Sequence, residues 1–101
     1  MMVFSLIALV VIFFSSSASA ADASNGEVLA RRWCAACHVV ATDQRGPVSE
    51  APPFATIAKK PDFNARQLAF FLLNPHPKMP DMGLSRREAE DLAAYIATVN
   101  K

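Results

Sequence analysis

The chain has 101 residues, of which 52% are hydrophobic and 19% charged, and its formal net charge is +1 at pH 7. This length allows one small domain. A charge so close to zero gives no basis for binding nucleic acid or an anionic membrane through bulk electrostatics.

Residues 1–20 are expected to be a secretory signal peptide. Residues 3–14 form an apolar run broken by one serine, and A-S-A at residues 18–20 fits an A-x-A cleavage site, although no Lys or Arg precedes the run. The run is shorter than the roughly 20 residues that span a bilayer, which argues against a retained anchor. We therefore expect cleavage after Ala20, export to the periplasm, and no stable membrane insertion of the single domain at residues 21–101.

The rest of the chain predicts an all-α domain that opens with a helix over about residues 25–36. The S-x-x-E pattern from Ser24 to Glu27 is typical of a capping box at a helix start. A loop containing Pro and Gly follows, with a short helical turn possible at residues 54–60.

Two further capping signals predict the later helices. N-x-x-Q from Asn64 opens a helix that must end near Asn74, because Pro75 disfavours helix at the residue before it. S-x-x-E from Ser85 opens the last helix, in which apolar residues recur at helical spacing up to about Asn100.

The pentapeptide C-A-A-C-H at residues 34–38 lies at the end of the first predicted helix and is typical of a c-type haem attachment site. Two thiols three residues apart can form thioethers to the two porphyrin vinyl groups. His38, next to the second thioether, is then held beneath the iron as its proximal ligand. The sequence therefore predicts one haem c, bound covalently through Cys34 and Cys37.

Two other uses of the cysteines are less suitable. A thioredoxin-like dithiol begins a helix after a strand, whereas here a helical pattern runs into the motif. A structural zinc needs four ligands, and the chain offers only Cys34, Cys37, His38 and His76, with neighbouring Cys37 and His38 poorly placed to reach one tetrahedral ion.

The second axial position of the iron is assigned to Met79. This residue lies between Pro77 and Pro80 on a stiff loop, and a thioether favours Fe(II) and raises the potential. Met82 is the alternative thioether. His76 would give bis-His iron of lower potential, but we interpret it as an exposed or hydrogen-bonded loop residue.

In this order, these features resemble the small class I c-type cytochromes of bacteria over residues 21–101. The resemblance is carried by Gly26 eight residues before Cys34, the motif at residues 34–38, A-P-P-F at residues 51–54 where the family usually has Gly-Pro-x-Leu, the Met79-Pro80 pair, and L-x-x-Y-I at residues 92–96. It implies a cytochrome c fold of three to four helices wrapped around one covalently attached haem, which would also stabilise a domain too small for a large core.

The resemblance also implies particular contacts. Gly26 should allow the first helix to cross closely against the last near Tyr95, and the Pro52 carbonyl should accept a hydrogen bond from His38 Nδ1. Ala51 in place of the usual Gly leaves the loop geometry open, with Pro47 the less suitable substitute for Pro52. The aromatic residues are expected in the haem pocket and core, namely Trp33, Phe54, Phe63, Phe70, Phe71 and Tyr95.

The sequence thus predicts a periplasmic one-electron carrier, not an enzyme, whose partners are redox proteins. Its cofactor-binding residues are Cys34, Cys37, His38, Pro52 and Met79, and its iron ligands are His38 and Met79. The alternatives are a haem subunit of a larger periplasmic oxidoreductase and an open-site haem protein that binds gas or peroxide. We expect a monomer or a subunit of a redox complex.

Overall fold

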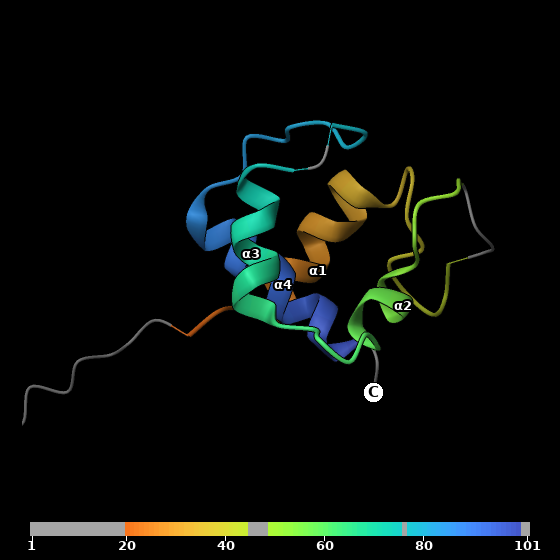
Figure 1. Cartoon of the computed structure of the whole chain (residues 1–101), viewed down its shortest axis with the longest axis horizontal. Coiled ribbons are helices and arrows are strands. Elements are labelled where there is room, and N and C mark those ends of the chain that lie inside the picture. The colour runs from red at the N-terminus through yellow and green to blue at the C-terminus, as the bar shows by residue number, and fades with distance from the viewer. Residues whose placement is uncertain (1–19, 45–48, 76, 100–101) are drawn as a thin grey trace, which may run out of the picture.

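The computed structural model describes residues 20–44, 49–75 and 77–99 (Figure 1). Over these ranges the chain is helical and has no strand, which confirms the predicted all-α class. The elements in chain order are α1 (Ala23–Leu29), the π-helical segment η1 (Ala30–Cys34), α2 (Phe54–Ala58), α3 (Ala65–Leu73) and α4 (Arg86–Thr98).

The start of α1 differs from the prediction, because Asp22 and not Ser24 caps it. The Asp22 carboxylate accepts from the backbone N–H of Asn25 at 3.1 Å. The backbone N–H of Asp22 donates in turn to Asp91 on α4 at 2.7 Å. This tertiary contact fixes the cap two residues earlier than the local S-x-x-E pattern indicated.

The capping signals of the later helices are confirmed. Asn64 accepts from the backbone N–H of Gln67 at 3.0 Å at the start of α3, which ends at Leu73 as the following proline required. At the start of α4, Ser85 accepts from the Glu88 N–H at 3.1 Å and Glu88 accepts from the Ser85 N–H at 2.9 Å. The short helix α2 also lies where a helical turn was expected.

Helix α4 is the centre of the fold, because it packs against α1, α3 and α2 (Figure 1). Its apolar face supplies much of the core, including Leu92 and Ile96, which are almost completely buried. Gly26 on α1 lies against the α4 backbone: a Cβ added there would be 2.6 Å from the carbonyl carbon of Asp91 and 2.8 Å from Tyr95 Cβ. The predicted close crossing of the first and last helices is thus present.

The aromatic residues divide into two groups. Phe54 and Tyr95 are buried and their rings pack edge to face, and Phe63 packs partly buried against the core, as expected. Phe70 on α3 is 79% exposed, so it does not pack in the polypeptide core, and its expected place in a haem pocket stays a prediction. Trp33 and Phe71 are 47% and 42% exposed, so they lie outside the polypeptide core.

In the part of the chain that the structure describes, no helix is both long and apolar enough to cross a membrane. The signal peptide expected at residues 1–20 lies outside the described residues except for Ala20. Pro47 and His76 also lie outside them.

Candidate functional site

The C-A-A-C-H motif begins at the last residue of η1, the π-helical segment that continues α1. In η1 the helix widens, and the Ala35 N–H donates to the Ala30 carbonyl, five residues back, at 3.1 Å. The chain then turns tightly, with the His38 N–H donating to Cys34 O at 2.8 Å. Single π-helical turns of this kind are frequent at functional sites. One turn therefore carries both thiols and the imidazole, although the regular helix ends earlier than the predicted Ala36.

The two cysteines are free thiols in different environments: Cys34 is buried and Cys37 is exposed. Burial raises the pKa of the Cys34 thiol to about 11. Since desolvation disfavours the thiolate, Cys34 is an uncharged S–H group at neutral pH in the polypeptide before haem is attached. A disulfide is absent from this pair, so both sulfur atoms are available for thioethers.

The His38 imidazole is buried, and its orientation is set by the backbone. Its Nδ1 atom lies 2.6 Å from the carbonyl oxygen of Pro52. A carbonyl oxygen can only accept, so Nδ1 carries the proton and donates it. This is the contact that the family resemblance implied. It leaves the lone pair on Nε2 to bind a metal, as in ligating histidines whose other nitrogen donates to a carbonyl. The ring of Phe54 packs beside the imidazole, with centroids 5.4 Å apart.

The two candidate thioethers both lie on the loop between α3 and α4 and are partly buried. Among the described residues, Met79 packs against the buried core cluster, whereas Met82 does not belong to the side chains that do so. The backbone of Gly83, just beyond them, has a positive φ of 64° and is tied by its N–H to Asp81 at 2.9 Å. A glycine readily adopts this left-handed conformation, which turns the chain toward α4.

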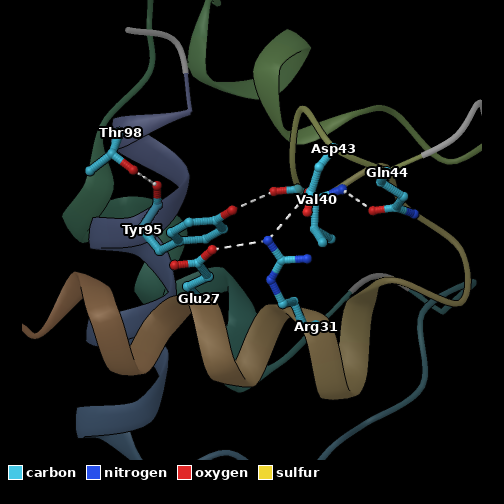
Figure 2. A network of polar contacts seen from close by, with 7 residues as sticks. All are labelled: Glu27, Arg31, Val40, Asp43, Gln44, Tyr95 and Thr98. Atoms are coloured by element: carbon cyan, nitrogen blue, oxygen red, sulfur yellow. Dashed lines mark hydrogen bonds and ion pairs between the residues drawn. The ribbon is translucent and has the colours of Figure 1, made fainter.

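Sequence reasoning did not predict the hydrogen bonds by which three polar residues, Tyr95, Gln44 and Asp91, hold the loop after the haem motif and the start of α1 in place. The Tyr95 hydroxyl donates to the buried carbonyl of Val40 at 2.6 Å, and Gln44 bonds to the Val40 N–H from the other side (Figure 2). Asp91 is 3% exposed and accepts from the Asn25 side chain at 2.9 Å as well as from Asp22. Asp91 stands four residues before Tyr95 on α4, so the two side chains lie on the same face of the helix. A charged residue on the face that was expected to cross the first helix was the signal that could have predicted this contact.

Two cavities in the described part of the chain are lined by residues outside the haem motif. One of about 580 Å³ lies between α3 and α4 and is lined by residues including Ala69, Phe70 and Ala94. A smaller one of about 290 Å³ lies beside the ion pairs that Arg31 forms with Glu27 at 3.1 Å and Asp43 at 3.3 Å (Figure 2). In the described chain, no group of three or more His, Cys, Asp or Glu side chains could hold a metal ion.

The helical fold and the thiol–thiol–imidazole turn define a small c-type cytochrome. Comparison with known proteins agrees: residues 21–96 match the family described as cytochrome c oxidase, cbb3-type, subunit III. The chain therefore belongs to this family of c-type cytochrome domains. It is also 59% identical over 85 residues to cytochrome c-552 of Bradyrhizobium diazoefficiens, an alignment that covers 84% of this chain and 82% of that protein. No solved structure matches the chain significantly.

The cofactor and the coarse function follow from this membership. The protein carries one haem c, attached through Cys34 and Cys37, and it is an electron-carrying c-type cytochrome with redox proteins as partners. The residues present fit the group, because both thiols are free and the imidazole is held with one nitrogen available. When bound, haem supplies one-electron chemistry between Fe(III) and Fe(II).

Proposed function

We propose that the protein is a periplasmic one-electron carrier, and not an enzyme, in which His38 and Met79 are the two axial ligands of the haem iron. A carrier of this kind keeps both ligands in both oxidation states, so little of the structure reorganises when an electron enters or leaves. The expected secretory leader supports the periplasmic location.

The observation that carries the proposal is the hydrogen bond from His38 Nδ1 to the Pro52 carbonyl, at 2.6 Å. It fixes the tautomer and the plane of the ring and makes Nε2 a better donor to iron. A neutral carbonyl can only accept, so Nδ1 remains the donor and Nε2 is the ring nitrogen that faces a metal. Pro52 thus acts on the haem through His38.

Met79 is the second ligand because of its loop. Pro77 and Pro80 restrict the backbone on either side of it, and its packing against the core directs the residue inward. A stiff segment loses little conformational entropy when a weak ligand is held at a metal. Met82, three residues further on, is the matched candidate that this proposal rejects.

Visible spectroscopy of purified haem protein in both oxidation states tests the ligands. Thioether ligation should give a weak charge-transfer band near the red end of the oxidised spectrum, lost in Met79→Ala and kept in Met82→Ala. Met79→Ala should also lower the reduction potential and bind carbon monoxide readily when reduced. Wild-type protein that lacks the band and binds carbon monoxide quickly at neutral pH would instead be an open-site haem protein. If only Met82→Ala loses the band, the carrier function stands and Met82 is the ligand.

A haem subunit of a larger oxidoreductase is the second candidate, favoured by the description of the matching family as an oxidase subunit. The haem chemistry is the same in both candidates, so they differ in whether the protein is free or bound in a larger complex. Size-exclusion chromatography of a periplasmic extract, followed at the haem absorbance, separates them. A free carrier elutes at the size of a small monomer, whereas a fixed subunit elutes with a large complex.

A further inference from the structure

One glutamine side chain bonds to the haem motif at three points. Gln44 Nε2 lies 2.9 Å from the carbonyl oxygen of His38 and 3.3 Å from that of Ala35. Its Oε1 accepts from the backbone N–H of Val40 at 2.8 Å. The first two partners lie inside the C-A-A-C-H sequence and the third lies two residues beyond it.

The orientation of this amide is determined by its partners. Two carbonyl oxygens can only accept, so the NH₂ group must face them, and the N–H of Val40 requires the oxygen. Gln44 is partly buried, so any of the three backbone groups left unpaired there would carry a desolvation penalty. Ala35 is the C-cap of η1, where carbonyl groups have no partner within the helix. Gln44 supplies that partner.

The same short segment is held from the opposite side. The Val40 carbonyl accepts from the Tyr95 hydroxyl, so Val40 is fixed by Gln44 through its N–H and by α4 through its C=O (Figure 2). His38 is fixed twice as well, through its ring by Pro52 and through its carbonyl by Gln44. Both the backbone that carries the imidazole and the orientation of the ring are therefore fixed by hydrogen bonds.

We propose that Gln44 is a positioning residue for the haem, which locks the backbone of residues 35–40 so that the imidazole of His38 meets the iron in one orientation. The proposal rests on the proposed role of His38 as an axial ligand. Gln44 itself need not touch the haem, since it acts on the backbone that carries the ligand.

Two substitutions distinguish the contributions of the three hydrogen bonds that Gln44 forms. Gln44→Glu keeps an oxygen for the Val40 N–H but, as a carboxylate, cannot donate to the carbonyls of Ala35 and His38. Gln44→Leu, of similar size, loses all three hydrogen bonds. Gln67→Glu is the control, because it makes the same change at the exposed glutamine of α3, far along the chain from the motif.

Three measurements on the haem-loaded proteins are needed: the proton NMR resonances of the His38 ring shifted by ferric iron, hydrogen exchange of the Val40 amide, and far-UV circular dichroism. We expect the His38 resonances to move in both Gln44 variants by more than they do in Gln67→Glu, with the helix content unchanged. The Val40 amide should exchange about tenfold faster in Gln44→Leu, the equivalent of one lost hydrogen bond, but at the wild-type rate in Gln44→Glu.

His38 resonances that stay at their wild-type positions in both Gln44 variants would overturn the proposal. If Gln44→Leu does not fold, the Glu variant alone decides by the same resonances. Failure of the proposed function is distinct, because wild-type protein would then show no His38 ring resonances shifted by the iron, or no thioether charge-transfer band.

Discussion

Gly26 is a position where a very small substitution should lower the stability of the fold markedly. Replacing it with alanine adds one methyl group between α1 and α4. The added Cβ would lie against the Asp91 carbonyl, 2.6 Å from its carbon, and 2.8 Å from Tyr95 Cβ. The carbonyl carbon and oxygen of Asp91 belong to the α4 backbone, and Tyr95 Cβ is bonded directly to it. No side-chain rotation can therefore relieve the overlap, and the two helices must separate.

The net cost combines two opposing contributions. Alanine in a helix interior is favoured over glycine by about 1 kcal/mol. Overpacking a close contact costs about 1–3 kcal/mol, and a clash with backbone lies at the upper end. We therefore expect Gly26→Ala to lower the free energy of unfolding by about 2 kcal/mol, and Gly26→Leu by more.

Guanidinium unfolding of the haem-loaded protein, followed by far-UV circular dichroism, measures this difference. Gly83→Ala is the control, because Gly83 has nothing within 4 Å of an added Cβ and only its positive φ of 64° resists substitution. That variant should lose about 1 kcal/mol from backbone strain alone. Gly26→Ala as stable as the wild type would refute the close crossing as a determinant of stability.

Three further predictions concern attachment and the polar contacts. Protein exported from a cell that matures c-type cytochromes should have the intact mass of residues 21–101 plus one haem that survives acid–acetone extraction; extractable haem or two free thiols would contradict this. Asp91→Ala leaves two donors of the α1 terminus unpaired and should cost about 2–3 kcal/mol in thermal or chemical unfolding, against less than about 0.5 kcal/mol for the exposed neighbour in Glu90→Ala. Burial raises the pKa of the Tyr95 hydroxyl above its ordinary value of 10.0, so the folded protein holds this proton more tightly than the unfolded chain. The resulting stability should be present below pH 10 and lost as pH rises through the raised pKa; an alkaline unfolding series should show this loss in wild type and not in Tyr95→Phe.

The elements that the sequence predicted well are those defined by local chemistry. The Ser85–Glu88 capping box and the apolar repeat of α4 are complete within the helix itself, and both are present as predicted. Asn64 and Pro75 likewise delimit α3 through short-range effects. The haem motif is also local, since its three reactive groups fall within five residues.

The parts that could not be predicted depend on contacts between distant residues. The start of α1 moved to Asp22 because Asp91, 69 residues later, holds the Asp22 N–H. Widening of the helix into η1 has no composition signal, and the Pro52 contact could be expected only from the family resemblance. The bonds of Gln44 join it to residues up to nine positions earlier, across a loop without periodicity.

The groups that hold the proposed proximal ligand are all uncharged. Pro52 offers a carbonyl to the His38 ring, Gln44 an amide to the His38 backbone, and Tyr95 a hydroxyl to Val40. A carboxylate in the place of the Pro52 carbonyl would draw the Nδ1 proton and stabilise Fe(III) through its negative charge. A neutral acceptor orients the imidazole without that bias, and so leaves the proposed ligand Met79 to set a potential that favours Fe(II). The neutrality of these contacts is thus consistent with the proposed electron carrier, because the groups around the proximal ligand add no charge that would favour one oxidation state of the iron.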